Sequence, residues 1–189
     1  MGLDMYVYRI KRPQLEDKVY KPEELYDKNL TFVSVENAEN EMSLFEQLIP
    51  YAEIRNVLTD YYDKAKMIAD YNLPKDSYIG MASSEGIRLC GTKDNGERVS
   101  QFIDSQEVEK KYIITKSVPH YIWHSSEEAY WRKAYEIQDW FYDNLDHVEN
   151  VGYYILDADL IAALNAEFDE EVPEDDPDDN EALFYHEWY

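Results

Sequence analysis

The order of apolar and polar positions predicts two strands near the beginning of the chain. Apolar and tyrosine side chains alternate over residues 3–10, which is the period-two pattern of a strand. Residues 30–35 are mostly β-branched or aromatic and predict a second strand. The polar stretch 11–29 between them is expected to be a loop with one helical turn at Pro22, because proline fits the first turn of a helix.

Residues 39–73 follow the period of an amphipathic helix instead. In the second half of this segment the spacings are 4, 3, 4 and 3, through Ile54, Leu58, Tyr61, Ala65 and Ile68. Pro50 is expected to kink the helix or to restart it, since proline is tolerated only in a first turn. Pro74 is expected to end it.

Residues 76–124 predict an antiparallel sheet made of short strands. The candidate strands are 77–82, 87–92, 97–103, 111–115 and 121–124. Asp94, Asn95 and Gly96 predict a hairpin turn between two of them, because Asn and Gly tolerate a positive φ.

A second long helix is predicted over residues 126–145. Ser125 and Glu128 have the spacing of a capping box at its start. Its expected core face consists of Tyr130, Ala134, Ile137, Phe141 and Leu145. A short strand over 152–156 follows, and Asp157 is expected to cap a last helix that runs to about residue 168.

These elements predict an α+β fold: an antiparallel sheet with three or four packed helices and an acidic C-terminal segment. With 189 residues, we expect a single domain over 1–166. Residues 167–182 hold ten acids in 16 positions and predict a solvated, irregular stretch. The aromatic ending of the segment 167–189, LFYHEWY, offers side chains that would fix it to the body.

The charge of the chain is large and unevenly placed. The net charge is −23, and residues 134–189 hold 18 acids without one Lys or Arg. Such a block disfavours direct contact with nucleic acid or an anionic membrane and attracts a positively charged partner. Simple solubility is the alternative explanation.

Part of this charge forms a row on the predicted helix 126–145. The acids recur at spacings of 3, 4 and 3: Glu136, Asp139, Asp143 and Asp146. Aromatic residues flank the row: Trp131, Tyr135, Trp140 and Tyr142. The C-terminal segment adds further acids: Asp169, Glu170, Glu171, Asp175, Asp176, Asp178 and Asp179. Acids beside aromatics resemble phosphates beside bases, so these residues are the predicted partner-binding surface; a solvated helix face is the alternative.

Motifs for catalysis or cofactor binding are missing from the sequence. It contains no GxSxG, no GxxxxGK[ST] and no GxGxxG. The single cysteine, Cys90, excludes an internal disulfide and lies on a predicted strand. On a strand, His120 and His124 would lie about 13 Å apart, too far to share a metal ion. We therefore predict no catalytic residue, cofactor or metal site. Because the sequence shows neither a signal peptide nor a membrane span, we also expect a cytoplasmic protein.

Two short motifs carry a resemblance. The first is the opening MGLDMY. The second is YWRKA, residues 130–134, whose pattern continues through Ile137 to Trp140 and Phe141. In these segments the chain resembles a family of small uncharacterised bacteriophage and prophage proteins, although Gln138 and Asp139 replace that family's usual His-Lys. The resemblance covers about 25 residues and implies a phage accessory protein acting inside a bacterium. It transfers no functional residue.

Together these features predict a non-enzymatic inhibitor that docks on the basic surface of a bacterial nucleic-acid-binding protein, such as a CRISPR effector or a restriction nuclease. One alternative is a small enzyme or small-molecule binder with a pocket of Tyr, Trp and carboxylates. In that case Asp4, His120 or His124 would be the acid–base candidates. The other alternative is a self-associating structural protein.

Overall fold

The computed structural model describes residues 3–149, 151–173 and 180–188 and confirms the predicted α+β class. Its contacts divide the chain into two compact units. The first, called here the large unit, comprises residues 1–57 and 118–189, and the small unit comprises 58–117. The strands β3 (Glu53–Tyr62) and β7 (Ile113–Arg132) pass from one unit to the other.

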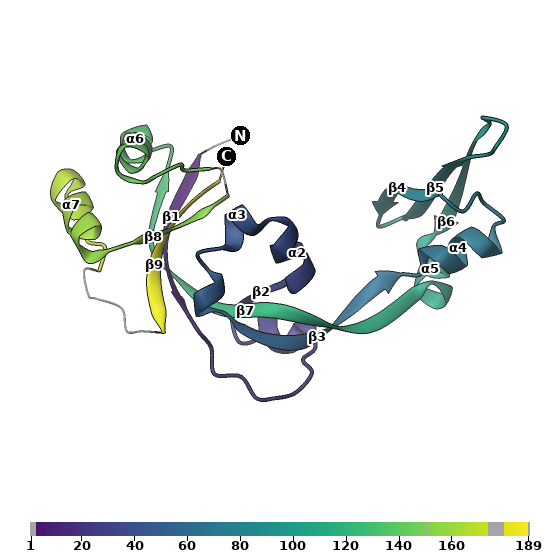
Figure 1. Cartoon of the computed structure of the whole chain (residues 1–189), viewed down its shortest axis with the longest axis horizontal. Coiled ribbons are helices and arrows are strands. Elements are labelled where there is room, and N and C mark those ends of the chain that lie inside the picture. Colours follow the sequence, from purple (N-terminus) through teal and green to yellow (C-terminus); the bar gives the residue numbers. More distant parts are fainter. Residues whose placement is uncertain (1–2, 150, 174–179, 189) are drawn as a thin grey trace. The chain divides into compact units, whose positions relative to one another are not determined.

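The large unit is built on a sheet with the strand order β2-β7-β1-β9-β8, in which β3 also pairs with β7 (Figure 1). The remaining strands are β1 (Asp4–Lys11), β2 (Leu30–Ser34), β8 (Tyr153–Leu156) and β9 (Glu181–Trp188). β1 pairs antiparallel with β7 on one side and with β9 on the other. The first strand of the chain therefore lies inside the sheet, beside the last one.

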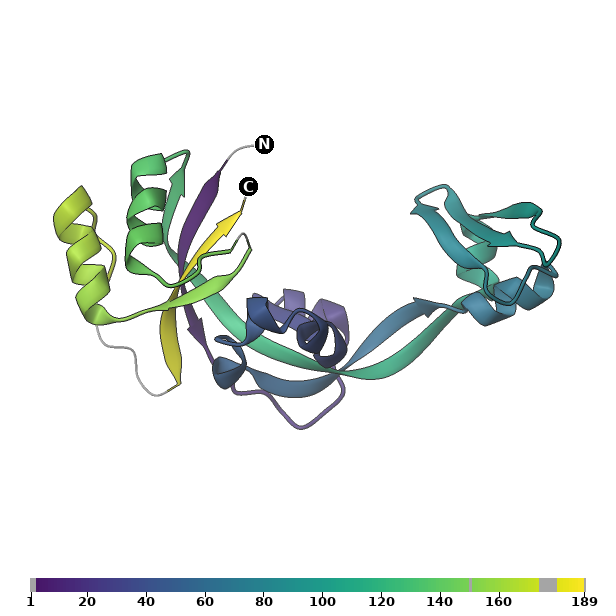
Figure 2. The same cartoon turned by 45° about the horizontal axis from the view of Figure 1, so that its top comes forward.

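Helices cover both faces of this sheet (Figures 1 and 2). One face holds α6 (Tyr135–Asn144) and α7 (Ala158–Phe168), where Phe141 stacks on Tyr185 of β9 with ring centroids 3.8 Å apart. Over part of the other face lie α2 (Val35–Asn40), α3 (Met42–Phe45) and the 3-10 turn η1 (Ile49–Tyr51). The period of two along each strand supplies buried side chains to both layers. None of the described helices is long and apolar enough to cross a lipid bilayer.

The C-terminal strand β9 is mostly buried. Residues 182–185 of this strand are at most 3% exposed. The aromatic ending therefore joins the sheet of the large unit by pairing with β1 and β8. Residues 174–179, in the acidic stretch, lie outside the described part of the chain.

The small unit is a three-stranded antiparallel sheet with two helices. Its strands are β4 (Tyr78–Ser83), β5 (Gly86–Thr92) and β6 (Arg98–Asp104), and its helices are α4 (Lys64–Asp70) and α5 (Ser105–Lys111). The predicted hairpin turn is confirmed, because Gly96 has a φ of 85° between β5 and β6. Met67, Leu89 and Tyr112 belong to its separate core.

The predicted helix over 39–73 is wrong. The segment contains α2 from Val35, then α3, η1, the strand β3 and finally α4. The stretch from Ile54 to Tyr62 is rich in β-branched and aromatic residues, and pairing with β7 outweighs its helix-like spacing. The other early helix, α1 (Pro22–Tyr26), starts with proline as predicted.

The predicted helix over 126–145 is also wrong in its first half. β7 continues to Arg132, and the helix α6 starts only at Tyr135. Ser125 pairs with Ile10 of β1 and caps no helix. The later expectations are confirmed: β8 covers 153–156, and the Asp157 side chain accepts a hydrogen bond from the Leu160 amide at the start of α7.

Candidate binding surfaces

Three acids of the predicted row lie on α6 and are exposed. Glu136, Asp139 and Asp143 follow each other at spacings of 3 and 4, on the side of the helix away from Ile137 and Phe141. Asp146 is exposed too, but it follows the end of α6 at Asn144 and so is not part of the helical row. The name "acidic row" is used below for the three helical acids.

The net charge belongs almost entirely to the large unit. Its sequence holds 31 acids against nine bases, whereas the small unit holds ten acids against nine bases. Long-range attraction of a cationic partner is therefore a property of the large unit, where the acidic row lies.

The aromatic residues predicted beside the row have different surroundings. Tyr135 is 60% exposed on α6. Trp131 belongs to β7, is buried, and donates its indole hydrogen to Oε1 of Glu170 at 2.9 Å. Trp140 lies edge-on to Phe141 and to Phe168, so it packs between α6 and α7. These two tryptophans hold the fold together and are not exposed anchors.

The acids predicted after α7 also differ from one another in exposure. Asp169 is exposed and ends α7 in a left-handed conformation, with φ 54°. Glu170 is half-buried against Trp131, and Glu171 is exposed. The other members of the predicted set lie outside the described residues: Asp175, Asp176, Asp178 and Asp179.

A further carboxylate, not predicted from the sequence, is buried, and no ion pair joins it to a basic side chain among the described residues. Glu187 on β9 is fully buried. Its oxygens accept hydrogen bonds from Tyr142 and Tyr185, each at 2.8 Å, and from the Gln138 side chain at 3.1 Å. Burial, followed by the bond to Glu187, raises the pKa of Tyr185. This group ties α6 to the sheet, so Tyr142 also has a structural role.

Aromatic side chains gather on the face of the sheet opposite α6. The set, called here the aromatic face, consists of Tyr6, Tyr8, Tyr130, Tyr153 and His186. Four of them form one row across four strands, because Tyr6 pairs with both Tyr130 and His186, and His186 pairs with Tyr153. Cross-strand partners point to the same side of a sheet, which is why the rings meet.

The rings of the aromatic face are in contact with one another. The ring centroid of Tyr6 lies 5.2 Å from that of Tyr8 and 5.0 Å from that of Tyr130. Tyr153 stacks on His186 at 4.3 Å with planes 16° apart. Burial lowers the pKa of His186, and its Nδ1 is 3.0 Å from the carbonyl oxygen of Gly152. The row is therefore a continuous floor that contains a neutral imidazole near pH 7.

Asp4 borders this floor. Its Oδ1 accepts a hydrogen bond from the Tyr130 hydroxyl at 2.7 Å and lies 3.7 Å from Nε of Arg132. Residues 4–6 of the first motif and 130–132 of the second thus lie on neighbouring strands, since Asp4 pairs with Arg132 and Tyr6 with Tyr130. Period-two alternation marks only the first of these segments in the sequence, and the helical prediction over 126–145 left residues 130–132 without a predicted strand.

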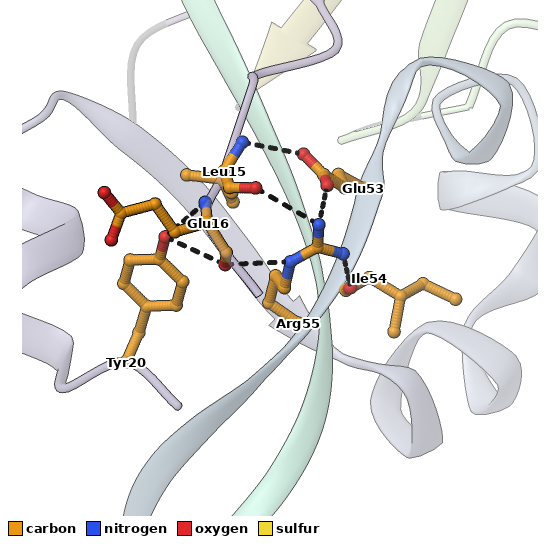
Figure 3. A network of polar contacts seen from close by, with 6 residues as sticks. All are labelled: Leu15, Glu16, Tyr20, Glu53, Ile54 and Arg55. Carbon is orange, nitrogen blue, oxygen red and sulfur yellow. Dashed lines mark hydrogen bonds and ion pairs between the residues drawn. The ribbon is translucent and has the colours of Figure 1, made fainter. Parts of the chain in front are cut away.

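The large unit also has an open groove of about 1040 Å³, lined mainly by residues 11–15 and 52–55. Beside it, the Arg55 guanidinium donates to the carbonyl oxygens of Leu15, Glu16 and Ile54 and pairs with Glu53 (Figure 3). Arg55 therefore fastens the loop after β1 to β3. With its donors used by the chain, this arginine serves the fold.

The two candidate histidines lie on β7, and the single cysteine belongs to the small unit. His120 is buried on β7, and its Nδ1 lies 2.9 Å from the Val118 carbonyl oxygen. Nδ1 of His124 is buried and has no hydrogen-bond partner within the described part of the chain. Cys90 is on β5 in the small unit. Among the residues that the structure describes, no three His, Cys, Asp or Glu side chains are grouped so as to hold a metal ion.

Comparison of the chain with known protein families, with curated proteins and with solved structures finds no match.

Proposed function

We propose that this chain is a non-enzymatic binding protein whose acidic large unit docks on a basic, nucleic-acid-binding surface of a bacterial protein. The observation that carries the proposal is the acidic row on α6, exposed in a unit with 31 acids and nine bases. In keeping with the phage resemblance, the partner would be a defence protein such as a CRISPR effector or restriction nuclease in the bacterial cytoplasm, and binding would inhibit it.

Electrostatics supports this direction of binding. Basic grooves that bind a nucleic-acid backbone are complementary to regularly spaced negative charges. Glu136, Asp139 and Asp143 present such charges on one helix face. Tyr135, exposed at the start of the same helix, supplies a stiff aromatic surface of the kind enriched at interfaces. The same charge repels DNA and RNA, so direct nucleic-acid binding is not part of the proposal.

The test is capture of proteins from bacterial lysate by the tagged chain. The wild type is compared with the triple variant Glu136→Lys, Asp139→Lys, Asp143→Lys at low salt and at about 0.5 M salt, where charges are screened within a few ångströms. We expect the wild type to retain a nucleic-acid-binding protein that the variant does not retain, and high salt to release it.

A matched control makes the same change in charge elsewhere. Glu85, Asp94 and Glu109 are exposed acids of the small unit, and all three are replaced by Lys. This control should capture the partner like the wild type. Equal loss in both variants, or capture that persists unchanged in high salt, contradicts docking through the acidic row.

A further inference from the structure

One end of the aromatic face is accessible. Tyr130 is 45% exposed, and Trp188, which pairs with Asp4 in the next row of the sheet, is 60% exposed. At the other end, Tyr51 of η1 packs edge-on against Phe184, so the floor is covered there. The accessible end therefore combines tyrosine rings, an indole and the carboxylate of Asp4.

We propose that this end is a binding site for a planar organic cation, and specifically for the guanidinium group of an arginine side chain. The site is called here the cation site and consists of Asp4, Tyr6, Tyr130 and Trp188. The acidic row lies on α6, which covers the opposite face of the sheet. The inference therefore goes beyond the proposed function and stands independently of it.

The charge of the site selects a cation. Aromatic rings present a negative face, and the Asp4 carboxylate borders them. Glu127, in the row of Tyr8, adds a second carboxylate near the rings, within a unit of strong net negative charge. A phosphate or a nucleotide would be repelled by the same groups.

The geometry of the site selects a planar group. Cross-strand pairing fixes Tyr6 beside Tyr130, and the bond from Tyr130 to Asp4 holds the hydroxyl end of the ring. The two contacts that this carboxylate makes with described side chains, Tyr130 and Arg132, use Oδ1, so Oδ2 can accept from a bound guanidinium. A guanidinium can stack on a ring and donate in its own plane at the same time, which an ammonium group cannot do.

Arg132 supplies an internal competitor. Its Nε lies 3.7 Å from Asp4, and its side chain is 66% exposed, so the pair is weakly held. If the site takes a cation, removing this arginine strengthens binding. If the site takes an anion, removing it weakens binding. The direction of this one change separates the two chemistries.

The experiment is a titration followed by NMR through the indole of Trp188. The probe is a capped peptide of alternating glycine and arginine, compared with peptides in which citrulline or lysine replaces arginine. Citrulline keeps the planar shape without the charge, and lysine keeps the charge without the plane. We expect the arginine peptide to bind most tightly, Tyr130→Leu to weaken it about two- to thirtyfold, and Arg132→Gln to tighten it.

Other results overturn the proposal. Equal binding of the arginine and citrulline peptides would mean that the site does not recognise the positive charge. Equal binding of the arginine and lysine peptides would mean that it does not recognise the planar group. Weaker binding by Arg132→Gln, or preference for a short oligonucleotide, assigns the site to an anion. The triple variant of the acidic row should keep the preference for arginine over citrulline, so failure of the proposed function and failure of this inference are distinguishable.

Discussion

The hydroxyl of Tyr142 on α6 donates a hydrogen bond to Oε1 of Glu187 on β9, with a donor–acceptor distance of 2.8 Å. Tyr185 and Gln138 complete the hydrogen bonds of the same carboxylate. A buried carboxylate is tolerated where several donors surround it. The bond between Tyr142 and Glu187 joins α6, which carries the acidic row, to β9.

We expect Glu187→Ala to lower the free energy of unfolding of the large unit by about 1–3 kcal/mol, because the buried hydroxyl of Tyr185 loses its acceptor. All four tryptophans belong to the large unit, so urea unfolding followed by tryptophan fluorescence reports this unit. Glu171→Ala, at an exposed position, is the control. An equal, small effect of both changes would contradict a stabilising role for the buried carboxylate.

The pKa of His186 predicts a stability change with pH. Burial lowers this pKa below its ordinary value of 6.5, so the unfolded chain binds a proton more readily than the folded chain. The stability of the large unit should therefore fall as the pH decreases from 7.5 through 6.5. His186→Gln should reduce this slope, whereas His147→Asn, at an exposed position, should leave it unchanged. Urea midpoints measured from pH 7.5 to 5.5 test both outcomes.

The acidic row should respond to charge reversal with opposite signs at its two ends. Glu136 is in the first turn of α6, near the positive end of the helix dipole, and Asp143 is in the last turn, near the negative end. Glu136→Lys should destabilise the large unit and Asp143→Lys should stabilise it, each by about 0.3–1 kcal/mol at low salt. Thermal unfolding at low and high salt measures this. The same sign for both changes would contradict the placement of these residues.

Two glycines of the small unit form a matched pair. A Cβ on Gly86 would lie 2.1 Å from the carbonyl oxygen of Ile103, whereas a Cβ on Gly96 would have no atom within 4 Å. Gly96→Ala should cost about 1–2 kcal/mol through its positive φ alone. Gly86→Ala should cost more, because the pairing of β5 with β6 must shift. Hydrogen exchange of the Leu89 and Ile103 amides would show the difference, and equal protection in both variants would refute it.

The sequence predicted the elements that local chemistry determines. Asp157 begins α7, Gly96 makes the hairpin turn, and the alternation over 3–10 marks β1. It failed where pairing partners distant in the chain decide the outcome. The spacing of Ile54 through Ile68 fits a helix, but β3 exists because β7 is available to pair with it. No local rule contains that information.

The candidate surfaces follow the same division. The acidic row was predictable, because Glu136, Asp139 and Asp143 repeat within one helix. The aromatic face was not, since Tyr6 and Tyr130 are 124 positions apart and meet only through strand register. Trp131 was predicted to lie on the same helix as the acids and to take part in binding. It belongs to β7 instead, and its side chain is buried.

The position of β9 between β1 and β8 has a consequence for biosynthesis. The partners of β1 include residues 181–188, so this sheet closes only after residues 181–188 have left the ribosome. Until then, one edge of β1 has no β9 to pair with, and such edges invite aggregation. Pairing over this sequence separation raises the contact order and slows folding. The nascent large unit is therefore expected to depend on chaperones more than the small unit, whose strands are neighbours in sequence.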